Sequence, residues 1–209
     1  MTHTLHRRGT RESLSRDYTV TMLRAMGINN EGYLDKCKEF LRIAARHNPV
    51  NIASETKGNI FEYPLEEIIT QAEGDSMCVF DNPENVTALL KDLKEADLGL
   101  SVVVGGIYEK VDECFEKAGL KHHTGNFSLG IWGKTELLPD NDLLEITTMC
   151  GHGQIPANLV KVMVEDIRYG RRSPEDAVKI LTPNCKCGVF NPVRTAELLV
   201  VMAERDPDC

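Results

Sequence analysis

Met77–Val104 reads MCVFDNPENVTALLKDLKEADLGLSVVV, and this stretch decides the class of fold. Its two ends, Met77–Phe80 and Leu100–Val104, are short apolar runs of the kind that form buried strands. Between them, Asp81-Asn82-Pro83 is typical of a helix start, because asparagine and aspartate accept free backbone N–H groups and proline fits the first turn. The stretch therefore predicts a strand, a helix through Ala96 and a second strand.

Similar patterns flank this unit on both sides. Tyr18–Ala25 is typical of a strand, and Lys36–His47 of an amphipathic helix that ends before Asn48-Pro49. Asn51–Tyr63 has little periodicity and several polar residues, so we expect a surface loop there that could border a pocket. The other expected elements are helices over Leu65–Ala72, Tyr108–Ala118, Pro156–Tyr169, Ser173–Leu181 and Asn191–Glu204, and a strand over Asn126–Trp132.

The order of these elements predicts the fold class and its division along the chain. Strands alternating with helices indicate an α/β or α+β protein, either ferredoxin-like or a small three-layer sandwich. Leu137–Asn141 contains Pro139 and polar residues, which is typical of a hinge, and the chain beyond it has mainly helical patterns. We therefore expect an N-terminal extension over residues 1–16, an α/β domain over 17–136 and a helical C-terminal portion over 137–209.

The composition excludes several classes of protein. A hydrophobic fraction of 42% and a charged fraction of 27% are those of a globular chain rather than a disordered or fibrous one. The net charge of −8 argues against a nucleic-acid surface, because phosphate binding needs a concentrated positive field. No apolar run approaches the roughly 20 residues of a membrane span, and Met1–Arg16 lacks the apolar core of a secretory signal. The expected location is the cytoplasm.

The seven cysteines fall into two groups. Cys37 and Cys114 lie on apolar stripes of expected helices and Cys78 within an apolar run, where cysteine usually acts as a small buried hydrophobe. Cys209 ends the chain. The remaining three, Cys150, Cys185 and Cys187, lie in glycine-containing loops, and in a reducing compartment such cysteines indicate metal or redox use.

These loops repeat one pattern, Cys-x-(His or Cys)-Gly followed by a helix that begins at a proline. The first copy contains Cys150, His152 and Pro156, and the second contains Cys185-Lys186-Cys187-Gly188 and Pro192. Two ligands separated by one residue can face the same ion only if the backbone turns tightly, and glycine beside the second ligand permits the turn. Backbone N–H groups in the turns and at the following helix N-termini would stabilise thiolates there.

Three cysteines and one histidine form a complete set of four ligands. The set suits an iron–sulfur cluster, with three thiolates on the cluster and His152, a substrate or water at the last iron. It also suits tetrahedral zinc, although structural zinc knuckles usually separate their cysteines by two residues. The sequence favours the cluster, in the [4Fe–4S] form, over zinc.

Two simpler interpretations of the cysteine loops stay open. Cys150 could end a strand while Cys185–Gly188 forms an unliganded turn between helices. Alternatively, Cys185 and Cys187 could act as a redox dithiol, since they are close enough in sequence to react. Neither interpretation accounts for the matching pattern around Cys150 and His152.

Three further features are candidates for the site. Arg194, in the first turn of the last helix, could anchor an anionic substrate, although arginines in this position more often pair with a carboxylate such as Glu197. His122-His123 could carry a proton, although histidines after a helix C-terminus are more often solvated. Gly105-Gly106 follows a strand and precedes a helix, where an α/β protein could bind phosphate, but it lacks the dinucleotide-binding spacing.

Taken together, the sequence predicts a cytoplasmic iron–sulfur protein in redox or lyase-type metabolism. Cys150, Cys185 and Cys187 are the expected ligands, His152 is a fourth ligand or a proton donor, and Arg194 is the candidate substrate anchor. The expected partner is a small-molecule substrate or a redox protein, and a homo-oligomer is compatible with the sequence. The alternative is a zinc-stapled, non-enzymatic protein that binds a partner or delivers metal.

Overall fold

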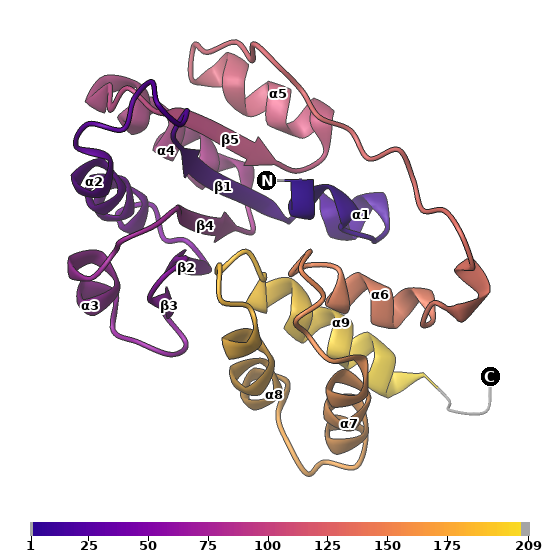
Figure 1. Cartoon of the computed structure of the whole chain (residues 1–209). Coiled ribbons are helices and arrows are strands. Elements are labelled where there is room, and N and C mark those ends of the chain that lie inside the picture. Colours follow the sequence, from indigo (N-terminus) through magenta and orange to yellow (C-terminus); the bar gives the residue numbers. More distant parts are fainter. Residues whose placement is uncertain (1, 206–209) are drawn as a thin grey trace.

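The centre of the molecule is an antiparallel sheet of five strands (Figure 1). The structure is a computed structural model that describes residues 2–205. The order across the sheet is β3-β2-β4-β1-β5, with β4 and β1 in the middle. The strands are β1 (Tyr18–Leu23), β2 (Asn51–Ser54), β3 (Gly58–Asn59), β4 (Ser76–Phe80) and β5 (Ser101–Gly105).

The connections between the strands give the ferredoxin-like topology that the sequence predicts. From β1 the chain passes through helix α2 to β2, which leaves a gap that β4 fills. From β4 it passes through α4 to β5, and β1 lies between these two strands. In each of these two βαβ units, a strand of the other unit lies between the two strands, which is the split βαβ arrangement. The short strand β3 extends the sheet beyond β2.

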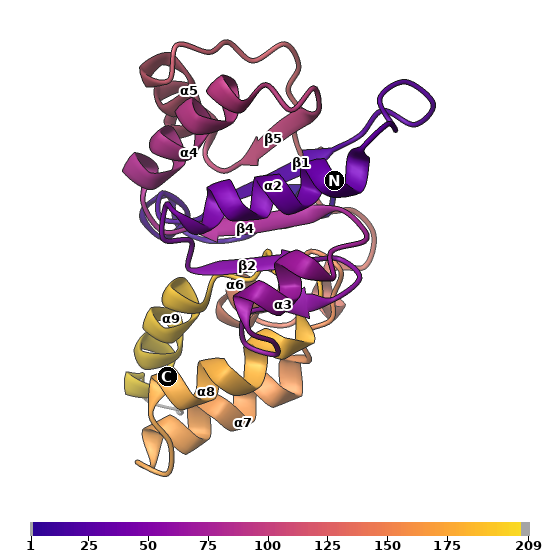
Figure 2. The same ribbon diagram turned by 90° about the vertical axis from the view of Figure 1, so that its left-hand side faces the viewer.

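Helices cover both faces of this sheet (Figure 2). The helices α2 and α4 follow β1 and β4 and pack on one face with α3 and α5, while α6–α9 pack on the other. The first layer consists of α2 (Tyr33–Ala45), α3 (Leu65–Thr70), α4 (Pro83–Ala96) and α5 (Tyr108–Lys117). The second consists of α6 (Asn141–Thr147), α7 (Ala157–Arg168), α8 (Pro174–Leu181) and α9 (Pro192–Glu204), with 3-10 turns at Thr135–Leu137 and Thr182–Asn184.

Strand β4 shows how one sheet serves two cores. Cys78 and Phe80 belong to the core beneath α2 and α4, whereas Met77 and Val79 belong to the core beneath α6–α9. This follows from the strand itself, because successive side chains point to opposite faces. All four side chains are at least 95% buried, and an apolar strand covered on both faces has no need of polar alternation.

The N-terminal segment is tied to the helical C-terminal portion by buried Arg194 of α9. Its guanidinium donates to the Asp17 carboxylate at 2.9 Å and to the Ser13 hydroxyl at 2.8 Å. It also donates to the backbone oxygen of Arg8 at 2.6 Å and to Glu145 of α6 at 3.3 Å. The segment contains a 3-10 turn at Thr2–His6 and α1 (Arg11–Leu14). One side chain thus joins three parts of the chain that are far apart in sequence.

Two sequence-based expectations are wrong. Asn51–Tyr63 is not a surface loop, since it contains the buried strands β2 and β3. Its polar residues are compatible with burial, because Asn51 and Asn59 donate from their side-chain amides to backbone oxygens inside the protein. The segment Asn126–Trp132 is not a strand, and most of its large apolar side chains are exposed in an extended chain without a pairing partner.

Within residues 2–205, none of the helices combines the length and apolarity needed to cross a bilayer.

Candidate metal centre

The two cysteine loops occupy equivalent positions in the helical layer. Cys150 lies three residues after α6 ends and leads into α7, which begins after Pro156. Cys185 and Cys187 follow the Thr182–Asn184 turn and lead into α9, which begins at Pro192. The expected glycine turns are present, because Gly153 and Gly188 have left-handed φ angles of 67° and 69°. The repeated sequence pattern therefore corresponds to repeated local structure.

The four predicted ligands come together as a line of contacts. Sγ of Cys185 lies 3.7 Å from Sγ of Cys187, and the latter lies 3.7 Å from Nδ1 of His152. At the other end, Cys185 is hydrogen-bonded to Cys150, whose sulfur lies 3.6 Å from Oε1 of Gln154. Cys150, Cys185 and Cys187 are almost fully buried, whereas His152 is at the exposed rim. The fold thus joins two sequence-distant motifs into one cluster.

These contacts shift the pKa values of the thiols in opposite directions. The pKa of Cys150 is lowered from its ordinary 9.0 to about 6. The main cause is a hydrogen bond from Cys185; burial opposes the shift, and hydrogen bonds from the backbone N–H groups of Gln154 and His152 add to it. Hydrogen bonding to Cys150 and Cys187, together with burial, raises the pKa of Cys185 well above 9.0. Cys150 is therefore the thiolate of the pair, and Cys185 keeps its proton.

The second loop is pressed against the β2–β3 hairpin. The Asn59 amide donates to the backbone oxygen of Cys185 at 3.0 Å, and Lys186 forms an ion pair with Glu62 at 2.6 Å. A Cβ atom on Gly188 would lie only 2.3 Å from Cβ of Ala53 in β2. Glycine is therefore required at 188 for space as well as for its φ angle, whereas Gly153 has open space around its Cα. The hairpin that the sequence analysis missed is what fixes this loop.

The ligand atoms are neighbours, but they do not already surround a common centre. Among the residues that the structure describes, no group of three or more His, Cys, Asp or Glu side chains is placed so that it could hold a metal ion. Contacts join Cys150 to Cys185, Cys185 to Cys187, and Cys187 to His152. A bound ion would therefore require these side chains to move. The short distances between these side chains are compatible with a metal site, but the side chains are not arranged around a common centre.

The other predicted site residues lie elsewhere. Arg194 is 2% exposed and its donors are engaged by Asp17, Ser13, Arg8 and Glu145, so it has no donor directed at a substrate. Glu197, the alternative partner, pairs with Arg16 instead. His122-His123 and Gly105-Gly106 line a groove beside β5. Cys37, Cys78 and Cys114 are buried in the other core, as predicted, and Cys209 lies outside the described residues.

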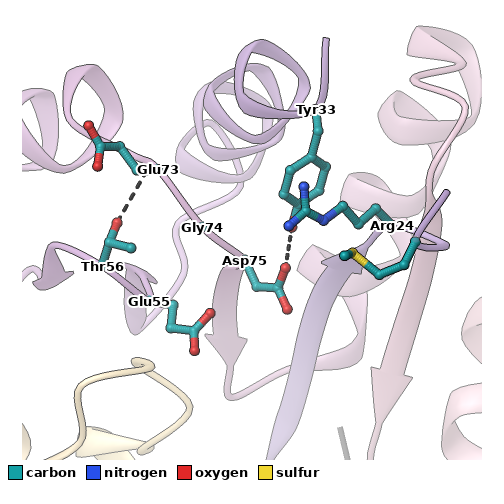
Figure 3. A pocket seen from close by; sticks show the side chains of 8 residues that line it. Arg24, Tyr33, Glu55, Thr56, Glu73, Gly74 and Asp75 are labelled. Carbon is teal, nitrogen blue, oxygen red and sulfur yellow. Dashed lines mark hydrogen bonds between the residues drawn. The ribbon is translucent and has the colours of Figure 1, made fainter. Parts of the chain in front are cut away.

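A hollow at one end of the sheet is lined in part by Glu55 and Thr56, in agreement with the expectation that Asn51–Tyr63 could border a pocket (Figure 3). It has a volume of about 560 Å³ and shares no lining residue with the cysteine loops. Its polar groups are largely engaged with one another, because Tyr33 donates to the Asp75 carboxylate and the Arg24 guanidinium lies 4.5 Å from the centre of the Tyr33 ring. Burial and this hydrogen bond strongly raise the pKa of Tyr33. The hollow is lined by Arg24, Met26, Tyr33, Glu55, Thr56, Glu73, Gly74 and Asp75.

Comparison with known protein families, with curated proteins and with solved structures found no match to this chain.

Proposed function

We propose that Cys150, His152, Cys185 and Cys187 bind one thiophilic metal centre that staples the helical C-terminal portion. The observation that carries the proposal is the 3.7 Å separation between Sγ of Cys185 and Sγ of Cys187, two buried thiols held in a glycine turn. Buried sulfurs in contact, with a histidine nitrogen at the same distance from one of them, form a donor set for a soft metal ion.

The distances favour a single ion over a cluster. Two thiolates bound tetrahedrally to zinc at about 2.3 Å place their sulfurs about 3.8 Å apart, and a thiolate and an imidazole nitrogen come about 3.6 Å apart. Both values agree with the separations along the line of contacts. In a [4Fe–4S] cluster each cysteine binds a different iron, which keeps the sulfurs farther apart. Zinc is therefore our first candidate, although the sequence alone favoured the cluster.

An iron–sulfur cluster is the second candidate because of the position of His152. The three cysteines are buried while this histidine is exposed at the rim, so the fourth ligand position is the one nearest to solvent. A centre with three protein thiolates and an accessible fourth position is the arrangement that lyase-type chemistry at an open iron requires. In that case His152 would be a proton donor beside the centre rather than a ligand.

A structural role for the metal is supported by the helices that the two cysteine loops connect. The first connects α6 to α7, and the second connects α8 to α9, so one ion would join two of the three connections within the helical layer. Metal-binding free energy would then contribute directly to the folding of that layer. Six free cysteines within the described chain are in keeping with a reducing cytoplasmic location.

The test is metal analysis of the whole chain purified without oxygen. We expect colourless protein with one equivalent of zinc, and a chelator should lower its melting temperature. Brown protein that contains iron and acid-labile sulfide would show that the centre is an iron–sulfur cluster rather than zinc. A chain that carries no metal and binds neither zinc nor a reconstituted cluster would overturn the proposal.

His152→Ala separates the two candidates, with His123→Ala as the matched histidine control. For a zinc staple, the change at His152 should weaken metal binding and lower the melting temperature, because one of four ligands is lost. For a cluster with three thiolates, it should leave the visible spectrum and the iron content in place while lowering the turnover, because a proton donor is lost. The control should change none of these measurements.

A further inference from the structure

A groove runs along the unpaired edge of β5, far in sequence from the cysteine loops. It has a volume of about 730 Å³ and is bounded by β5, α5 and the extended chain over residues 121–128. This volume is within the range of small-molecule sites, which is roughly 300–1,000 Å³. Its floor is apolar and includes Leu93, Val102, Val104, Val111, Phe115 and Leu120.

Three polar side chains in this groove form a hydrogen-bonded relay. Nδ1 of His122 lies 2.9 Å from the Asp112 carboxylate, and Nε2 of the same ring lies 2.6 Å from the Tyr108 hydroxyl. Tyr108 and Asp112 are four residues apart on α5 and therefore share one face of the helix. His122 reaches them from the chain that returns past the helix, where its ring stacks edge-on against Tyr108.

The order of the relay determines what Tyr108 offers to a ligand. A carboxylate can only accept, so in the neutral imidazole the proton is on Nδ1, toward Asp112, and Nε2 is an acceptor. In that tautomer Nε2 accepts a hydrogen bond from the Tyr108 hydroxyl. The phenolic oxygen keeps its lone pairs for another donor, and the relay makes it a better acceptor than an isolated phenol.

The surroundings hold this oxygen beside an apolar wall. The Phe127 ring lies 5.2 Å from the Tyr108 ring, and a Cβ on Gly125 would already be 3.4 Å from Tyr108. The alternative is that Asp112 and His122 form an ordinary surface ion pair. That alternative does not account for the hydrogen bond to Tyr108 or for the apolar groove beside it. Here the apolar floor and the single oriented acceptor occur together, which is the usual composition of a small-molecule site.

We propose that the groove beside β5 binds a small molecule with an apolar ring and one hydrogen-bond donor, such as a hydroxyl group, which donates to the Tyr108 oxygen. The apolar floor supplies most of the affinity through burial of the ring, and the relay supplies specificity for the donor. This site is independent of the proposed metal centre, because the two have no residue in common.

The experiment compares two fluorescent probes that differ in one group, 2-naphthol and 2-methoxynaphthalene. Both present the same fused ring, but only 2-naphthol has a donor. We expect the full chain to bind 2-naphthol more tightly, and Tyr108→Phe to weaken 2-naphthol by about 3–10-fold, the value of one hydrogen bond, while leaving the methoxy compound unchanged. His122→Ala should reduce the preference in the same direction.

Two controls keep the result clear. Tyr108 is 40% exposed, so removal of its hydroxyl should not disturb folding, and circular dichroism of the variant checks this. Tyr169→Phe, which removes the hydroxyl of an exposed tyrosine outside the groove, should leave the preference for 2-naphthol intact. Metal content does not enter this measurement, so failure of the metal proposal would not be mistaken for failure of this one. Equal binding of both probes, no binding of either, or a Tyr108→Phe variant that keeps the preference would each overturn the proposal.

Discussion

The two faces of the sheet bury the same number of described thiols and use them differently. Beneath α2–α5 lie Cys37, Cys78 and Cys114, which belong to one apolar core. Beneath α6–α9 lie three others that contact one another in glycine turns. Burial is nearly complete on both faces, so burial alone does not distinguish a small hydrophobe from a candidate ligand. The difference lies in whether one sulfur has another as its neighbour.

The pKa values of the thiols also differ between the two faces of the sheet. On the first face, burial is the main cause that raises the pKa of Cys37, Cys78 and Cys114. On the second face, contact between sulfurs lowers the pKa of Cys150 and raises that of Cys185. A lone buried thiol thus stays protonated, whereas thiols in contact release one proton more easily because the remaining proton is shared.

The largest expected contrast comes from removing one thiol on each face. Cys185→Ser should remove all bound metal, because a serine hydroxyl is a poor ligand for soft metals, and should cost more than about 4 kcal/mol of unfolding free energy through loss of the centre. Cys78→Ala should retain full metal content and cost about 1–2 kcal/mol through a small cavity. Metal analysis and urea unfolding of both variants give the comparison. Metal loss in Cys78→Ala alone would reverse our assignment of the two faces.

A smaller contrast is expected between the two loops of the second face. Gly188→Ala should cost about 2–5 kcal/mol, because it adds left-handed strain and a clash with Ala53 in β2. Gly153→Ala should cost about 1–2 kcal/mol, since strain acts there without a clash. Denaturant unfolding of the two variants measures both values. Equal costs would mean that the hairpin does not press on the second loop as described.

The smallest expected effect is a pH dependence of the metal-free chain. The pKa of Cys150 is lower in the folded protein, about 6, than its ordinary 9.0, so the unfolded chain binds more protons between these values. Stability should therefore rise from pH 6 toward pH 9 and lose this contribution as the pH falls through 6. Melting temperatures of chelator-treated protein at pH 6, 7 and 8 measure the slope. Cys150→Ser should flatten it and Cys114→Ala should not; a slope unchanged by Cys150→Ser would assign it to other groups.

Much of the fold could be predicted because local rules and tertiary structure agree. Asn82 caps α4 with its side chain and Ser173 caps α8, as their positions before proline indicate. The prediction of a surface loop over Asn51–Tyr63 failed because local pattern and tertiary structure disagree there. Asn51 and Asn59 are polar, but their side chains form hydrogen bonds inside the protein. Helix α6 was not predicted either, because the proline and polar residues of Leu137–Asn141 indicate a hinge and α6 begins within that stretch.

The segment Asn126–Trp132 shows the limit of pattern alone. Its alternation of large and small residues is that of a strand, yet the structure gives it no neighbour to pair with. A strand is stable only through hydrogen bonds to another strand, which a local pattern cannot supply. Helices contain their own hydrogen bonds, and those expected from the sequence are all present in the described chain.

The sequence by itself determined the alternation of strands and helices, the capped helix starts and the two matching cysteine turns, because each depends on residues within a few positions of one another. Only the tertiary structure decided that the two turns meet, that Arg194 is engaged by the N-terminal segment, and that His122 faces Asp112 and Tyr108 across a groove. These contacts depend on how separate elements pack on the sheet, and packing brings together side chains whose separation in sequence carries no local signal.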